Sequence, residues 1–177
     1  VRAPIAYVNV TLNNIGGLTS ATIPAGTIFN TVIDDVNYQF VTVAEHNALT
    51  VNGVLSFSNI PIHEGTYVTN RYTVDTDNVD QKFYVNDANG DTTTLLVDVF
   101  NTASSTSSTT FTQALDNTQV KSDSNVYFLQ ESVDGKFEVY FGDGVTGKAL
   151  SDGNIVRLRY VVTNKTAANG ASSFTTS

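Results

Sequence analysis

The sequence predicts an all-β fold built mainly from antiparallel hairpins, with little helix. Apolar and polar residues alternate with a period of two along most of the chain, and no window of about 11 residues carries the i, i+3, i+4, i+7 stripe of an amphipathic helix. Turn residues interrupt the alternation at short intervals, as is typical of β-sandwiches and barrels. A polar segment rich in Asp, Asn and Thr spans residues 69–80, so we expect two small barrel- or sandwich-like modules, residues 1–70 and 71–177.

The N-terminal module is expected to contain short strands joined by tight turns. Residues 5–12 and 37–43 are rich in β-branched and aromatic side chains and predict strands, and Pro24-Ala25-Gly26 predicts a turn between two short extended pieces. Asn52-Gly53 lies between two β-rich arms. Because both central residues of a type I′ turn need positive φ, this dipeptide predicts a hairpin.

Two hairpins and a final strand are expected in the C-terminal module. The first hairpin would pair residues 82–85 with 92–100, in which Leu95, Val97 and Val99 share one face. The second would pair 125–132 with 136–141 across Val133-Asp134-Gly135. The last strand is predicted over 154–163, with alternate apolar residues on a core face and both arginines, Arg157 and Arg159, on a solvated face.

Two segments of this module allow more than one interpretation. The Ser/Thr-rich run 101–111 fits a mobile surface loop, although its alternating threonines would also suit an edge strand. Residues 112–122 suit a short helix or an irregular turn.

Charge and composition argue against several kinds of partner. The formal net charge is −8 and the basic residues are scattered, with only Arg157 and Arg159 close together, so we expect no nucleic-acid or anionic-membrane partner. No apolar run approaches the roughly 18 residues of a membrane-spanning helix. The absence of Cys removes disulfides, Cys-ligated zinc and thiol catalysis. The chain begins at Val1 and contains no Met, and we expect it to be a fragment of a longer protein.

The stretch 139–154 imitates two phosphate-binding motifs. Its first three glycines spell G-x-G-x-x-G, and with Lys148 they nearly spell a P-loop, except that Ala149 stands where a Ser or Thr would hold magnesium. Both motifs need a helix after the glycines. A new turn at Asp152-Gly153 follows within a few residues, so we expect a connection between two strands and no cofactor.

A second segment imitates a calcium-binding loop: residues Asp87 to Asp91, together with Asp98. Thr92 replaces the glycine required at the sixth position, and the bidentate Glu of the twelfth position is missing. The other carboxylates are spread over turns, where Asp favours backbone capping. We therefore expect no metal site.

The two histidines, His46 and His63, have no second His close to them in the sequence. A catalytic pair of His63 with Glu64 would need a nucleophile brought by the fold. We expect each His to be a solvated loop residue or a hydrogen-bonded residue at a strand end, and we expect no catalytic residue in the chain.

The positions that carry a family resemblance lie mostly in the stretch 139–174. They are Phe141, Gly142, Asp143, Gly144, Gly147, Gly153, Tyr160 and Ala168-Asn169-Gly170. Their order, with the earlier segments 23–31, 38–43 and 82–99, resembles the baseplate J-like proteins of contractile phage tails, and in particular the baseplate wedge proteins of T4-like phages. In that family a strand ends in Phe-Gly-Asp-Gly and is followed by turn glycines, a basic strand with a Tyr, and an Ala-Asn-Gly segment.

The resemblance implies a structural role and no enzymatic activity. Such proteins join wedges into the ring of a sixfold baseplate, through contacts with other wedge proteins and copies of themselves. It implies a place in the virion tail baseplate after assembly in the host cytoplasm, no small-molecule substrate, and a structural turn at the Phe-Gly-Asp-Gly positions. An extracellular β-sandwich module of a bacterial surface adhesin is the alternative, because Thr-rich, acidic, Cys-free tandem β-domains are built in that way. A nucleotide-binding protein or an enzyme is a third, weaker reading.

Overall fold

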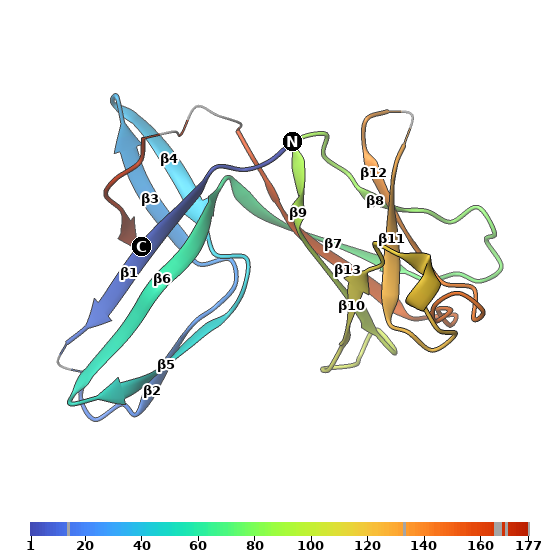
Figure 1. Ribbon diagram of the computed structural model, residues 1–177, viewed down its shortest axis with the longest axis horizontal. Coiled ribbons are helices and arrows are strands. Elements are labelled where there is room, and N and C mark those ends of the chain that lie inside the picture. Colours follow the sequence, from blue (N-terminus) through green and yellow to red (C-terminus); the bar gives the residue numbers. More distant parts are fainter. Residues whose placement is uncertain (14, 133, 165–167, 169, 177) are drawn as a thin grey trace. The chain divides into compact units, whose positions relative to one another are not determined.

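The computed structural model describes residues 1–13, 15–132, 134–164, 168 and 170–176 (Figure 1). The predicted all-β class is confirmed. Over these residues the strands form two seven-stranded sheets, and the described helix is a three-residue 3-10 turn, Asn117–Gln119. That turn lies in the segment 112–122, for which a short helix or irregular turn was expected.

The chain divides into two compact units, Val1–Tyr67 with Val161–Ser177 and Val68–Tyr160. This grouping differs from the expected modules 1–70 and 71–177, because the C-terminal segment from residue 161 belongs with the N-terminal unit. The division into the modules 1–70 and 71–177 stays a prediction.

The sheet of the first unit is built around one long strand, β6. Its strands are β1 (Ile5–Leu12), β2 (Ser20–Ile23), β3 (Ile28–Ile33), β4 (Val36–Val41), β5 (His46–Val51), β6 (Val54–Glu64) and β14 (Thr175–Thr176). Their order is β14-β3-β4-β6-β5-β2, and β1 pairs antiparallel with β6. Alternate residues of these strands form the core, including Val8, Phe29, Phe40, Phe57 and Ile62.

Turn chemistry in the first unit follows the sequence closely. Asn52 and Gly53 have φ of 50° and 75° and join β5 to β6, so the predicted hairpin is confirmed. The Pro24-Ala25-Gly26 turn between β2 and β3 is confirmed as well. Asp34 and Asp35, at φ of 49° and 62°, join β3 to β4.

The second sheet has the order β7-β13-β9-β10-β11-β12-β8. Its strands are β7 (Thr66–Thr73), β8 (Phe83–Val85), β9 (Gly90–Phe100), β10 (Thr109–Gln113), β11 (Val126–Glu131), β12 (Phe137–Phe141) and β13 (Ile155–Val162). The predicted hairpin of β11 and β12 is confirmed, with Gly135 at φ 71° in its turn. Val133, part of the same predicted turn, lies outside the described residues.

The expected hairpin between residues 82–85 and 92–100 is wrong. β8 pairs antiparallel with β12, placing Val139 opposite Phe83, whereas β9 lies between β13 and β10. The turn before β9 does reverse the chain, since the N–H of Gly90 donates to the carbonyl of Asp87 at 2.9 Å. The turn reverses the chain direction but does not determine which strand β8 pairs with. In its position beside β12, Phe83 packs edge-on against Phe141, with ring centroids 5.6 Å apart.

The Ser/Thr-rich run is part loop and part strand. Residues 101–108 form turns, whereas β10 begins at Thr109 and pairs antiparallel with β9 and parallel with β11. β10 is therefore an internal strand of the sheet rather than an edge strand.

Candidate functional site

A group of charged side chains from β9 and β13, with a hydroxyl from β10, lies on one face of the second sheet. Asp98 comes from β9, and Arg157 and Arg159 come from β13, two residues apart and thus on the same face of the strand. The arginines lie opposite the buried residues Val156, Leu158 and Tyr160, as expected, but their face is only partly solvated. The exposed fractions of their side chains are 25% and 23%, and the side chain of Asp98 is only 4% exposed.

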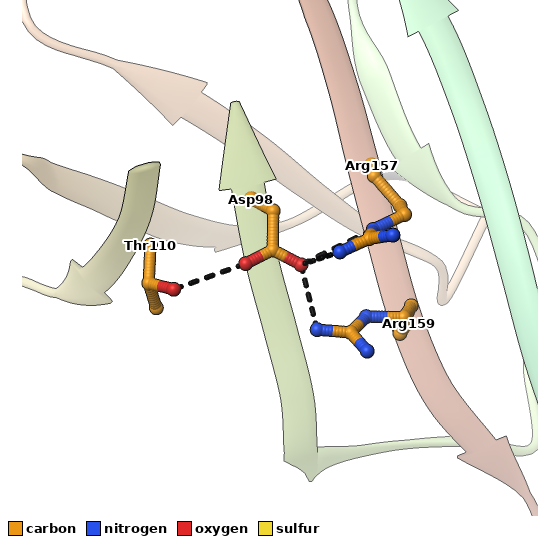
Figure 2. Close-up of polar contacts among 4 residues, drawn as sticks. All are labelled: Asp98, Thr110, Arg157 and Arg159. Carbon is orange, nitrogen blue, oxygen red and sulfur yellow. Dashed lines mark hydrogen bonds and ion pairs between the residues drawn. The ribbon is translucent and has the colours of Figure 1, made fainter. Parts of the chain in front are cut away.

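Figure 2 shows how the arginines converge on the carboxylate of Asp98. Oδ2 accepts hydrogen bonds from Arg157 Nε at 3.2 Å, from Arg157 Nη2 at 2.9 Å and from Arg159 Nη2 at 2.7 Å. Oδ1 accepts a hydrogen bond from the hydroxyl of Thr110 on β10 at 3.0 Å. A buried carboxylate is costly unless it is paired and hydrogen-bonded, and these donors meet that requirement.

A third arginine extends this surface through an aromatic ring. Phe100 follows Asp98 by two residues on β9 and is 6% exposed. The guanidinium carbons of Arg157 and Arg71 lie 4.8 and 5.1 Å from its ring centroid, within the range of cation–π contacts. We call Arg71, Arg157 and Arg159, with Asp98 and Phe100, the arginine face.

The arginine face carries more positive than negative charge. Three guanidinium groups lie there with the one carboxylate of Asp98, and Arg71 is exposed. Guanidinium groups stay protonated and present several N–H donors in a planar fork, which suits carboxylates and other anions. This arrangement favours recognition of an anionic group by a protein whose net charge is −8.

The Phe-Gly-Asp-Gly positions lie where β12 ends. Oδ1 of Asp143 accepts the N–H groups of Thr146 at 2.8 Å and Val145 at 2.9 Å, and these bonds hold the pKa of the Asp143 carboxyl below its usual range. The N–H of Gly144 donates to the carbonyl of Gly147 at 3.0 Å. The result is a closed turn with its own internal hydrogen bonds.

Two features of this turn bear on the phosphate motifs. The N–H groups of Gly144 and Gly147 donate to backbone carbonyls, that of Gly147 to Lys121 at 3.0 Å, so they do not point at an open anion site. An ideal Cβ built on Gly142 would lie 2.2 Å from the backbone of Gly147. The glycines thus let two backbone segments touch.

The remaining positions of the resemblance lie around this turn. Phe141 packs edge-on against Phe111 at 5.4 Å, and Gly153 lies in a separate turn, where its N–H donates to the carbonyl of Val74 at 2.9 Å. That Phe141, Gly142, Asp143, Gly144, Gly147 and Gly153 are the motif of the family stays a prediction.

The three carboxylates of the calcium-like sequence each bind different protein groups. Asp87 caps the N–H of Asn89 at 2.8 Å, and Asp91 accepts the N–H and hydroxyl of Thr93 at 2.9 and 2.7 Å. Asp98 belongs to the arginine face. Over the residues that the structure describes, no group of three His, Asp or Glu side chains could hold a metal ion.

His63 and Glu64 are consecutive on β6 and so point to opposite faces of the strand. Glu64 is fully buried and ties the C-terminal segment to β6. Its carboxylate accepts the hydroxyl of Thr163 at 2.6 Å, the N–H of Asn164 at 3.0 Å and the side-chain amide of Asn164 at 3.1 Å. His46 is the first residue of β5.

Sequence reasoning missed the arginine face although one signal pointed to it. Arg157 and Arg159 were the one close basic pair, but the alternation of β9 does not say that Asp98 lies on the strand beside them.

None of the helices described is long and apolar enough to cross a membrane.

Comparison with protein families matches residues 68–171 to the third domain of the bacteriophage baseplate wedge protein gp6. The chain belongs to this family. The match covers more than half of the chain, and it includes every residue of the arginine face and of the Phe-Gly-Asp-Gly turn. A search of curated proteins finds no match.

Membership of the gp6 family confirms the resemblance to baseplate wedge proteins. The protein is a structural component of a phage tail baseplate, located in the virion, and its partners include other baseplate proteins. This favours the baseplate over the adhesin module, and a structural family suggests a non-enzymatic protein.

Proposed function

We propose that this chain helps to join baseplate wedges into the baseplate ring, through contacts with other wedge proteins and with copies of itself. The observation that carries the proposal is the arginine face, a positive surface on an acidic chain that belongs to a baseplate family. We propose that this face is one of the contact surfaces and that its occupant is a carboxylate-bearing surface of another baseplate protein.

The chemistry of the arginine face suits a protein partner. Arginine and aromatic residues are enriched among the residues that contribute most to binding between proteins. Asp98 fixes the guanidinium groups of Arg157 and Arg159 before a partner arrives, so less side-chain entropy is lost on binding. Arg71 lies over Phe100 and is exposed, which leaves its N–H donors for a carboxylate.

The charge of the chain bears on which classes of partner it contacts. A net charge of −8 disfavours nucleic acid and anionic membrane as partners, and we propose protein contacts alone, with no small-molecule substrate, cofactor or enzymatic activity. Assembly would take place in the host cytoplasm, before the baseplate becomes part of the virion.

Charge reversal of Arg71 in the phage that encodes the protein tests this function. Arg71→Glu should leave wedges that form but assemble into rings about tenfold less efficiently, because a repulsive pair replaces an attractive one. Lys121→Glu is the matched control, since Lys121 is exposed but lies outside the arginine face. Sedimentation and electron microscopy of wedges and rings give the readout. Normal ring assembly by Arg71→Glu would show that this face does not join wedges.

A further inference from the structure

The turn between β5 and β6 carries an Asn-Gly pair that is open to solvent, at the tip of this hairpin (Figure 1). Asn52 and Gly53 are both exposed. A Cβ built on Gly53 would meet no atom within 4 Å. Among the residues that the structure describes, nothing therefore packs over the peptide bond that joins this pair.

An Asn that precedes a Gly loses its side-chain amide without the help of an enzyme. The backbone nitrogen of the Gly gives up its proton and attacks Cγ of the Asn, so that a new C–N bond forms and the side-chain nitrogen leaves as ammonia. Water then opens the resulting succinimide ring at either of its carbonyl groups. The products are Asp, with the original backbone, and isoaspartate, whose backbone runs through the side chain and is one carbon longer. Gly favours the ring closure because it has no Cβ to obstruct the attack.

A second Asn-Gly pair, Asn89-Gly90, is held in place by its surroundings. Gly90 is buried at the start of β9, and its N–H donates to the carbonyl of Asp87 at 2.9 Å. The N–H of Asn89 donates to Oδ1 of Asp87 at 2.8 Å. A Cβ built on Gly90 would lie 2.7 Å from a side-chain carbon of Val85. Because the attacking nitrogen of this pair is engaged and buried, local opening must precede ring closure.

We propose that Asn52 is a deamidation site: in the folded chain it converts to Asp and isoaspartate, while Asn89 is protected. The assignment rests on the exposure of both residues of the first pair and on the open space around Gly53. Each conversion adds a negative charge at the tip of the β5–β6 hairpin. A virion makes no new protein, so converted copies accumulate with the age of the particle.

The position of this turn gives the conversion a structural consequence. β5 pairs with β6 through Thr50 opposite Leu55 and Val51 opposite Val54, directly beside the turn, and β2 joins the sheet through β5. A two-residue turn of this kind matches the twist of its flanking strands, and the longer backbone of isoaspartate breaks that match. Conversion to isoaspartate thus loosens β5 and β2. Conversion to Asp keeps the turn, because Asp tolerates positive φ as Asn does.

Ageing of the 177-residue chain in mildly alkaline buffer tests the proposal, since the attacking nitrogen must lose its proton. Cleavage after Glu places the three Asn-Gly pairs of the sequence in separate peptides, 46–64, 65–131 and 139–177, and mass spectrometry with fragmentation measures the converted fraction of each Asn. Asn52 should convert about tenfold faster than Asn89, or more, because Asn89 reacts only after local opening. In urea the two should convert at similar rates. The proposal fails if Asn89 converts as fast as Asn52 in the folded chain, or if neither converts there while both convert in urea.

Hydrogen exchange tests the structural consequence. Asn52→Gly is the matched control, because Gly-Gly also suits this turn and carries no amide to lose. After ageing, the amides of β2 and β5 should exchange faster in the unaltered chain, in proportion to its isoaspartate content, and at their original rate in Asn52→Gly. Freshly prepared Asn52→Asp supplies the charge without the longer backbone and should exchange as the fresh chain does. Equal exchange before and after conversion of Asn52, or equally faster exchange in aged Asn52→Gly, would overturn this consequence.

Discussion

The ion cluster of the arginine face makes a quantitative prediction about stability. Asp98→Ala removes the acceptor of three N–H contacts from Arg157 and Arg159. Breaking a fully buried ion pair by removing one partner costs about 3–5 kcal/mol. Here both arginine side chains remain about one quarter exposed, so they can turn toward water and recover part of that cost. We expect a loss of about 2–3 kcal/mol in the free energy of unfolding.

The reverse perturbation should cost more. In the double variant Arg157→Ala/Arg159→Ala, the carboxylate of Asp98, whose side chain is 4% exposed, would keep only the hydroxyl of Thr110 as a donor among the contacts described above. An unpaired buried carboxylate cannot recover solvation without opening the sheet, so we expect about 3–5 kcal/mol. The double arginine variant should lose more stability than Asp98→Ala, because the charge left unpaired in it is the less exposed one.

Urea denaturation and thermal unfolding of the 177-residue chain measure both effects. Asp98→Ala should lower Tm by roughly 5–10 °C, whereas Asp123→Ala, at an exposed position, should stay within about 0.5 kcal/mol of the unaltered chain. Added salt should change the difference little, because partly buried pairs are weakly screened. The reasoning fails if Asp98→Ala matches Asp123→Ala, or if it costs more than the double arginine variant.

Three further predictions concern burial and turns. Glu64→Ala should cost about 2–4 kcal/mol in urea denaturation, because it removes the acceptor of the buried Thr163 hydroxyl and of two N–H groups of Asn164; an effect below about 1 kcal/mol would contradict this role. Gly142→Ala should cost about 3 kcal/mol or more through its backbone clash, and Gly144→Ala, which meets only an ordinary contact with Ala149 but has φ of 84°, about 1–2 kcal/mol; equal losses would refute the clash. Burial raises the pKa of the Tyr127 and Tyr160 hydroxyls, so their stabilising contribution is full below about pH 10 and is lost as pH rises above it, when the unfolded chain ionises first. In the folded chain, the part of the tyrosinate absorbance that is lost in Tyr127→Phe and Tyr160→Phe should titrate above the usual range, and a normal titration of that part would contradict the burial.

The parts of the fold that sequence predicted are those specified by neighbouring residues. Asn52-Gly53 determines its turn because both residues readily adopt the positive φ that the turn requires. The strands on either side, β5 and β6, then pair with each other. Asp34 and Asp35 adopt the same region without a glycine, which Asp tolerates but does not require. The pairing of β8 with β12 depends on strands far apart in the chain, and a local turn signal contains no information about it.

The arginine face escaped prediction for a similar reason. The alternation on β13 shows that Arg157 and Arg159 share one face of the strand. The alternation on β9 shows that Asp98 lies on the face opposite to that of its apolar neighbours. Neither pattern says that β9 and β13 lie side by side, and without that pairing each charge is expected in water. The hydrogen bond from the Thr163 hydroxyl to Glu64 likewise joins residues 99 positions apart, so no local sequence pattern predicts that the chain returns to the first unit.

The presence of the ion cluster is itself an argument about function. Replacing a buried ion pair by well-packed apolar residues is often neutral or stabilising, so stability alone gives no reason to place Asp98 among arginines on an outer sheet face. What the carboxylate does provide is a fixed position for Arg157 and Arg159, while Phe100 holds Arg71 beside them. A surface with ordered guanidinium groups is useful to a protein that must dock repeatedly on the same partner, as in the baseplate of a tail. Asp98→Asn can separate the two roles, since it keeps the shape and one acceptor oxygen but removes the charge that orders the arginines: ring assembly should then fall more than the stability of the chain does.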